Sequence, residues 1–219
     1  MKALLIQIAS LVCHQLPSKA FNLNELTMPL CSRCTGIYVG FLIALIFQLI
    51  LGSQKRDKFP SLGVSLFNIF FILLMPIQAL SSQSLPWLNN NHLRFLTGLL
   101  FGGSINILFL PVFNYFFFQR CIDKQTVRDW EKYLFLLVIY AIIFSIHFID
   151  VSFIFYFIGY ASVIGLIAVY LMINTFLSTF IIGWKKRKEN FRTVLLLIFL
   201  VILFFFGEIM LFSHNPVKF

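Results

Sequence analysis

Three cysteines and one histidine near the amino terminus are the residues whose types and spacing most clearly indicate chemistry. Cys13 and His14 are adjacent, and Cys31 and Cys34 complete a segment of 22 residues that ends where a long apolar run begins. Thiolates and imidazoles bind soft transition metals, and thiolates exchange disulfides. The segment therefore predicts a metal site or a redox site at the mouth of a membrane helix.

A metal site is the first interpretation of this segment. Cys31 and Cys34 have the C-x-x-C spacing that lets two thiolates chelate one ion. Cys13 and His14 would complete a Cys3His or Cys2His set, although the chain between Cys13 and Cys31 shows no strong secondary-structure pattern. Such a ligand set suits tetrahedral zinc, and the softness of sulfur also allows iron or copper(I).

Thiol–disulfide exchange is the first alternative. Cys31 and Cys34 would lie at the amino terminus of a helix, where the helix dipole and Arg33 both favour the thiolate. A quinone would accept the electrons, and Arg94 or His92 would bind its carbonyl group. Enzymes of this kind need a second cysteine pair to relay electrons, but the outer side offers only Cys13, because Cys121 lies in an expected inner loop.

A structural disulfide is the second alternative. A bridge from Cys13 to Cys31 or Cys34 would hold the amino-terminal segment against the first span, and thiols outside the cytoplasm are readily oxidised. The protein would then be a transporter or an accessory subunit of a membrane complex, with other membrane proteins as partners.

The composition places these residues in a membrane protein. Of the 219 residues, 60% are hydrophobic and 11% are charged, against roughly 25% charged residues in soluble domains. The mean hydropathy is +0.92, and several uncharged stretches reach the ~20 residues that cross a bilayer. The lipid bilayer is the expected partner. The net charge of +9 lies in short loops, so we expect no nucleic-acid partner.

We expect an all-α polytopic bundle that forms a single transmembrane domain over residues 1–219. Residues 1–33 would form an extracytoplasmic Cys/His segment that includes a short half-inserted helix. The chain from 133 to 183 is long enough for two crossings, with a turn at Ile149-Asp150 or at Gly159-Tyr160, and equal division favours the second. The six spans are then expected near 34–51, 62–80, 95–118, 133–157, 161–183 and 193–212.

The basic residues predict the orientation. Loops after the first, third and fifth spans carry 12 of the 17 lysines and arginines. The positive-inside rule makes these loops cytoplasmic. The Cys/His segment and the carboxyl terminus would therefore face outward from the cytoplasmic membrane of a prokaryote.

Ionisable residues within the spans form a second group of candidates, because they are costly in a bilayer. Counting about 1.5 Å per residue puts them near the outer ends of their spans. His147 and Asp150 are spaced i, i+3, so within a helix they would share a face. Outer ends of spans collect polar residues in any membrane protein, which is the competing explanation. The catalytic candidates are His147, Asp150, Glu208 and Arg94, and the cofactor-binding candidates are Arg33, Arg94 and His92.

No Walker loop, kinase signature, G-x-S-x-G elbow or H-E-x-x-H motif occurs in the chain. The enzyme classes that these motifs identify are therefore unsupported, and whether the protein is an enzyme stays open.

The motifs around the cysteines resemble those of a known family. C-H-Q-L-P at 13–17 and P-L-C-S-R-C-T-G-I-Y at 29–38 are similar to the signature of a family of small prokaryotic membrane proteins of unknown function, C-H-Q-x-P followed by P-L-C-x-R-C-x-G-x-Y. Residues 91–98 resemble its later N-x-x-R-x-x-T-G stretch. The likeness covers about residues 10–105. It implies a membrane bundle and supports the cysteines, His14, Arg33 and Arg94 as site residues, without implying a reaction.

The chain departs from the family pattern at two places. Lys19-Ala20 replaces the Arg-Ser that follows the proline in the family, and Gln78-Ala79 lies near the place where an Asp-Gly is expected. If that aspartate takes part in chemistry, this chain lacks it.

Overall fold

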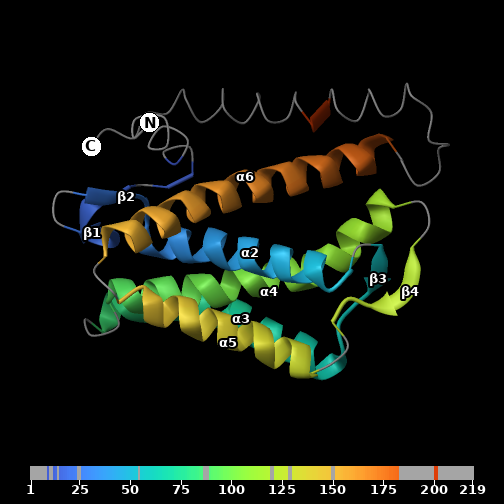
Figure 1. Cartoon of the computed structure of the whole chain (residues 1–219), viewed down its shortest axis with the longest axis horizontal. Helices are drawn as coiled ribbons and strands as arrows, with labels where there is room; N and C mark the ends of the chain where they lie inside the picture. The colour runs from blue at the N-terminus through green and yellow to red at the C-terminus, as the bar shows by residue number, and fades with distance from the viewer. Residues whose placement is uncertain are drawn as a thin grey trace.

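The computed structural model describes residues 9, 12–13, 15–23, 26–53, 55–85, 89–118, 121–127, 130–148, 151–182 and 200–201. These residues form a helical bundle with a pair of short strands at each end (Figure 1). In chain order the elements are a 3₁₀ turn Pro17–Lys19, β1 Ala20–Leu23, β2 Leu26–Cys31, α2 Ser32–Ile50, β3 Arg56–Lys58, α3 Leu62–Ser84, α4 Asn91–Phe117, β4 Ile122–Gln125, α5 Trp130–Ile146 and α6 Ser152–Ile182.

The centre of the bundle is the close contact between α2 and α4. Each helix carries two glycines four residues apart, Gly36 and Gly40 on α2 and Gly98 and Gly102 on α4. A Cβ atom at any of these four positions would collide with a backbone carbonyl of the facing helix. Small residues at this spacing let two membrane helices approach closely and gain van der Waals contact along their backbones. The glycines thus fix which residues of α2 and α4 lie side by side.

The other helices surround this pair. Gly165 lets α6 approach the backbone of α2 at Tyr38, and α3 packs against α4. The buried Tyr140 of α5 lies against Gly103 and donates a hydrogen bond from its hydroxyl to the Gly40 carbonyl, at 3.1 Å. That bond links α5 to α2, and it removes the cost of an unpaired hydroxyl in the core.

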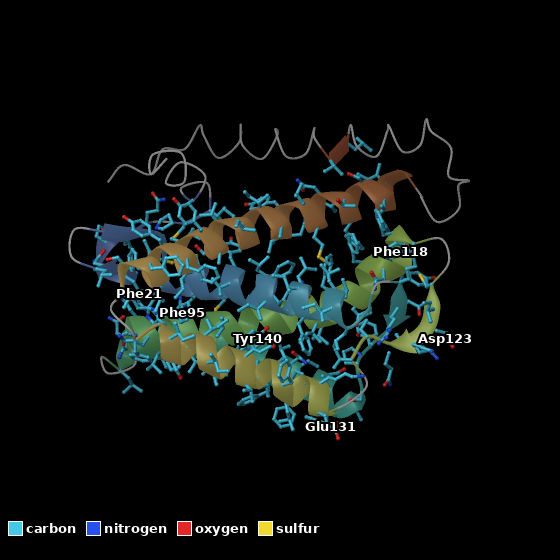
Figure 2. The ribbon with its side chains drawn as sticks, viewed as in Figure 1. Phe21, Phe95, Phe118, Asp123, Glu131 and Tyr140 are labelled. Carbon is cyan, nitrogen blue, oxygen red and sulfur yellow. The ribbon has the colours of Figure 1, made fainter. Side chains whose placement is uncertain are left out.

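The two strand pairs lie at opposite ends of the bundle (Figure 1). The antiparallel pair β1–β2 joins Ala20 to Cys31 at the end where α2 and α4 begin. The parallel pair β3–β4 lies at the other end, near the labelled Asp123 in Figure 2. There Asn114 of α4 donates to the carbonyls of Ser53 and Arg56. The basic loops that follow the first and third expected spans are therefore on one side of the bundle, as the sequence predicts.

The helices have the length and the surface of membrane spans. Within the described residues, α2, α3, α4 and α6 are long and apolar enough to cross a bilayer. Their outward faces are apolar, for example at Phe70 and Leu73 of α3 and at Phe157 and Phe180 of α6. Lipid tails solvate such faces at no cost, whereas water would not. The expected all-α membrane bundle is confirmed at this level.

One expected turn is wrong. The boundaries 133–157 and 161–183 place the turn at Gly159-Tyr160, but these residues lie within α6, and the chain turns between Ile146 and Ser152 instead. Equal division of the apolar stretch was a poor guide. The observed turn puts His147 beyond a helix end, where an ionisable side chain costs less than in the middle of a span.

The other differences are smaller. The first three helices extend beyond the expected 34–51, 62–80 and 95–118 by up to four residues at one end or the other. The chain before Cys31 forms the β1–β2 hairpin where no regular structure was expected. The expected span 193–212 lies almost wholly outside the described residues, and so does most of the short amino-terminal helix.

The glycine contact generates a direct test of the fold. Gly40→Ala should destabilise the protein by about 1–3 kcal/mol through overpacking, because the new methyl group would meet the Leu99 carbonyl. Gly159→Ala is the matched control, since its Cβ would meet only Pro29 at 3.7 Å. Alanine favours a helix over glycine, so the control should keep or raise the midpoint of thermal unfolding in detergent. A Gly40→Ala midpoint at or above the wild-type value would contradict the contact.

Candidate functional site

Three cysteine sulfurs meet at the end of the bundle that holds the β1–β2 hairpin. The Sγ atoms of Cys13, Cys31 and Cys34 all lie within 4.8 Å of one another. The Cys13 side chain is 4% exposed, and the other two are half-buried. All four cysteines of the chain are free thiols in the structure. The sequence-predicted meeting of the amino-terminal segment with the C-x-x-C pair is therefore observed for Cys13.

The start of α2 positions two of the three thiols. Cys31 is both the last residue of β2 and the residue that precedes the first turn of α2. Cys34 follows three residues later, and residues at i and i+3 lie on the same face of a helix. Their sulfurs therefore point to one side, at the positive end of the helix dipole.

Local hydrogen bonds bring the third thiol to this place. The backbone N–H of Cys31 donates to the Cys13 sulfur at 3.2 Å. The Gln15 side chain donates to the Pro29 carbonyl at 3.0 Å. Gln15 lies two residues after Cys13 and Pro29 two residues before Cys31, so this bond also holds the two cysteine segments together. At the start of α2, the Ser32 hydroxyl donates to the carbonyl of Lys19 in the 3₁₀ turn at 2.7 Å. These bonds fix the hairpin against α2.

The surroundings polarise the thiols. The pKa of Cys13 is lowered, because its sulfur accepts hydrogen bonds from the side chains of Cys31 and Cys34 and from the Cys31 backbone. The pKa of Cys31 is raised, mainly because its thiol donates to Cys13. Cys13 is therefore the first thiol of the cluster to ionise. Leu30, Tyr38 and Leu166 pack around it, so water gives its charge little solvation.

The arrangement of the sulfurs suits a soft metal ion. A tetrahedral zinc with Zn–S bonds of about 2.3 Å holds its sulfurs about 3.8 Å apart. The observed sulfurs lie within 4.8 Å of one another. Each separation therefore needs to shorten by no more than about 1 Å for all three sulfurs to bind one zinc ion. A disulfide joins two sulfurs at about 2.05 Å and would leave the third thiol over.

Three candidate residues cannot be placed. His14, Asp150 and Glu208 lie outside the described residues. The expectations that His14 is a ligand and that Asp150 and Glu208 act in catalysis stay predictions.

Arg33 lies beside the thiols, in the first turn of α2. Its guanidinium donates to the side-chain amide oxygen (Oε1) of Gln78 on α3 at 2.8 Å, and its Nε is buried without a hydrogen-bond partner in the described part of the chain. Gln78 is a neutral partner, so it satisfies a donor but does not neutralise the arginine. Arg33 lies near enough to Cys31 and Cys34 to interact with them electrostatically, while its role as a cofactor-binding residue stays a prediction.

Arg94 and His92 lie at the start of α4, in a second group of polar residues. Asn90 caps the helix by accepting the backbone N–H of His92, and Asn91 donates to the carbonyls of Ser18 and Ala20. Arg94 is 8% exposed and donates to the Asn89 side chain. These contacts join α4 to β1, so Arg94 and the cysteines share one end of the bundle.

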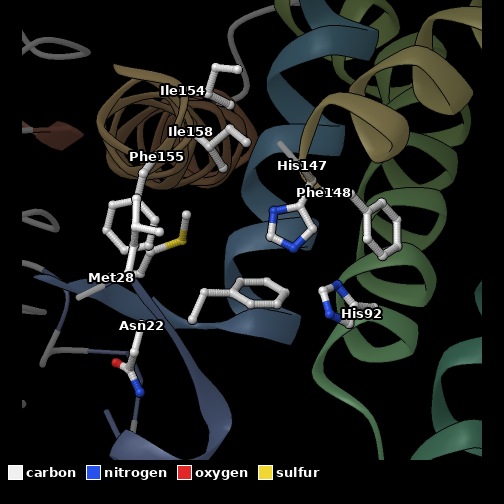
Figure 3. Close-up of a pocket in the computed structure, with 10 residues that line it drawn as sticks. Asn22, Met28, His92, His147, Phe148, Ile154, Phe155 and Ile158 are labelled. Atoms are coloured by element: carbon white, nitrogen blue, oxygen red, sulfur yellow. The ribbon is translucent and has the colours of Figure 1, made fainter. Parts of the chain in front are cut away.

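His147 lies beyond the end of α5, and its expected pair with Asp150 stays a prediction because Asp150 lies outside the described residues. Its ring lies 4.0 Å from that of Phe21 and 5.3 Å from that of His92, between centroids. Figure 3 shows the two imidazoles directed into one space from different segments. The structure thus brings together His92 and His147, which are 55 positions apart in the sequence.

Sequence reasoning missed the residues of the hairpin that take part in this end of the bundle. Lys19, Phe21 and Asn22 line the cavities beside His92 and Arg94. The run Asn89-Asn90-Asn91 before an apolar stretch was a usable signal, because asparagine caps helices. Nothing in the local sequence indicated Phe21.

Comparisons with known proteins agree with the membrane fold and cover the same half of the chain. The profile of the family described as "Predicted membrane protein (DUF2085)" matches residues 13–108. An uncharacterised protein of Methanocaldococcus jannaschii is 32% identical over 111 residues, which are 50% of this chain and 68% of that protein. An uncharacterised protein of Methanothermobacter thermautotrophicus is 29% identical over 97 residues, 44% of this chain and 83% of that protein. No solved structure matches.

The matched region contains the three clustered cysteines, Arg33 and Arg94, together with the glycines that join α2 to α4. The resemblance inferred from the motifs is thereby confirmed: the chain belongs to the family described as "Predicted membrane protein (DUF2085)".

Proposed function

We propose that this membrane protein binds one soft transition-metal ion, best matched by zinc, through Cys13, Cys31 and Cys34 at one end of its bundle. The observation that carries the proposal is the meeting of three sulfurs, from two separate segments, within 4.8 Å. Three thiols that share a buried place are costly to ionise together without a cation. A divalent ion removes that cost and converts the cluster into a cross-link between the amino-terminal segment and α2.

A fourth ligand decides between a structural and a catalytic ion. His14 follows Cys13 directly in the sequence, and as a ligand it would close a Cys3His site of the structural type. A catalytic ion would instead keep a position open for water or substrate. Arg33, which interacts electrostatically with Cys31 and Cys34, would balance part of the negative charge that three thiolates place around a divalent ion.

Thiol–disulfide exchange with a quinone is the second candidate. The lowered pKa of Cys13 favours it, because a thiolate is the attacking species. Electron transfer from these thiols to a second cysteine pair has little support. The one remaining cysteine, Cys121, directly precedes β4 at the opposite end of the bundle, where it donates to the Asn114 carbonyl at 3.4 Å. The transporter and accessory-subunit alternatives rest chiefly on residues outside the described part of the chain.

We infer that the whole chain forms one domain with six spans, and that its hairpin end faces outward from a prokaryotic cytoplasmic membrane. The four long helices support most of this count. The 17 residues of α5 rise about 25 Å, close to the thickness of the hydrocarbon core. The basic residues at the β3–β4 end support a cytoplasmic location for that end.

Metal analysis of the purified protein tests the metal site. Wild-type protein and Cys121→Ser should each contain about one equivalent of zinc or another soft metal. Cys13→Ser, Cys31→Ser and Cys34→Ser should each lose most of it, because three thiolates bind far more tightly than two. Elemental analysis in detergent, with thiol counts before and after chelation, gives the readout. If the wild-type protein contains no metal and its thiols become titratable only after treatment with a reductant, the result would favour thiol–disulfide exchange or a structural disulfide.

The role of His14 has its own test. His14→Ala should lower the zinc affinity by about tenfold or more if the imidazole is the fourth ligand, since loss of even an outer-shell partner costs 10–100-fold. Leu16→Ala is the neighbouring control, because its side chain is exposed and lies outside the apolar group that packs around Cys13. Competition against a chromophoric chelator measures the affinity. An unchanged affinity in His14→Ala would indicate a three-thiolate site with an open position.

Labelling with a membrane-impermeant maleimide tests the orientation. In a Cys121→Ser background, a cysteine at the exposed Ser84 should react in intact cells of a bacterial host, and one at the exposed Lys124 only after lysis. The parent chain gives the background from the three clustered thiols. The reverse pattern would place the hairpin end inside.

A further inference from the structure

A cleft beside the thiol cluster has two chambers of different chemistry. The first, about 660 Å³, is polar and lies between the hairpin and the start of α4. The second, about 320 Å³, is lined mostly by aromatic and aliphatic side chains, with Asn22, His92 and His147 among them, and lies between the hairpin, the turn after α5 and the start of α6 (Figure 3). Phe21, Asn22 and His92 line both, so one ligand could reach from one chamber into the other.

The polar chamber favours an anion. The described residues that line it include two cations and no acid: Ser18, Lys19, Ala20, Phe21, Asn22, Asn89, Asn90, Asn91, His92 and Arg94. It lies at the amino end of the 27-residue helix α4, which adds the positive end of the helix dipole. Side-chain amides and backbone N–H groups there are donors for phosphate oxygens.

Arg94 is an unbalanced charge in this chamber. It is 8% exposed, and its Nε has no hydrogen-bond partner in the described part of the chain. Its one side-chain partner, Asn89, is neutral. Arg33 lies close enough for the two positive charges to repel one another, and neither arginine has a carboxylate partner within the described ranges. A buried cation is costly unless it is paired, and among the described residues no carboxylate supplies that pairing, so an anionic ligand would stabilise Arg94.

The second chamber favours an apolar group attached to that anion. Met28, Phe155 and Ile158 form its wall, and the His92 and Phe148 rings stack at 4.6 Å. Phe148 is 53% exposed, and the neighbouring Val151 and Phe153 are also exposed apolar residues. This chamber thus borders a surface that lipid tails would cover, from which a hydrocarbon chain could enter between α5 and α6. A free soluble anion would leave it unused.

We propose that this cleft binds an anionic lipid, with its phosphate ester in the polar chamber on Arg94 and Lys19 and the start of its hydrocarbon chain in the apolar chamber. The His92 ring lines both chambers and would therefore lie beside the linkage between the headgroup and the hydrocarbon chain. The lipid site is separate from the thiols and does not rest on the proposed metal. The two sites share only the hairpin, through the pairing of Ala20 with Cys31.

Lipid binding to the detergent-purified protein tests the proposal. By native mass spectrometry, the protein should retain one phosphatidic acid more tightly than phosphatidylcholine of the same chain length. Arg94→Gln and Lys19→Gln should each weaken this binding by about tenfold or more, since bonds to charged groups are the strong ones. Lys124→Gln removes the same charge at the opposite end and should leave binding unchanged. Lys19 is exposed, so its variant should fold normally even if Arg94→Gln does not.

Three results would overturn the proposal. Equal loss of binding in Lys124→Gln would indicate general charge attraction. Glycerol 3-phosphate that stabilises the protein as strongly as phosphatidic acid would indicate a soluble anion. A neutral quinone that displaces phosphatidic acid at equal concentration would indicate that the cleft serves the redox alternative. The metal content of Lys19→Gln should equal that of the wild type, so failure of the lipid site is distinguishable from failure of the metal site.

Discussion

The backbone contact between α2 and α4 is the constraint on which both sites depend. Gly36 and Gly40 face Gly98 and Gly102 so closely that a single methyl group would separate the helices. This contact fixes the height of one helix relative to the other. It therefore places the C-x-x-C start of α2 beside the polar start of α4. If α2 and α4 were further apart, their backbones would no longer interlock and one helix could shift along the other. The thiols and arginines at their ends would then no longer have fixed positions relative to one another.

The β1–β2 hairpin converts this relation into two sites. Ala20 pairs with Cys31 at the start of α2, and Asn91 of α4 bonds the Ala20 carbonyl from the other side. The hairpin carries Cys31 at the end of β2, and its Phe21 on β1 forms part of the wall of the cleft. The bound metal would hold the hairpin closed, because Cys13 enters the site from the chain before β1. The proposed ion would thus also support the wall of the cleft.

The sequence predicted which cysteines meet at this end of the bundle better than it predicted the backbone structure that brings them together. The C-x-x-C spacing, the apolar runs and the basic loops are local or compositional signals, and they led to the cysteine cluster, the helical bundle and the two sides. The hairpin was missed because Ala20 and Cys31 find each other through tertiary contacts rather than through a local strand pattern. The turn after α5 was misplaced because equal division ignored the cost of His147 inside a span. The contact between His92 and His147 depends on how α4 and the end of α5 meet, which no spacing in the sequence encodes.

The central claim is that Cys13, Cys31 and Cys34 hold a metal ion in the folded membrane protein. X-ray absorption at the metal edge of the purified protein tests this most directly, because it counts the sulfur neighbours of the ion itself. The account predicts three sulfurs at about 2.3 Å and one lighter neighbour. An ion surrounded only by nitrogen and oxygen, or a sulfur count that stays at three when Cys13 is serine, would contradict it.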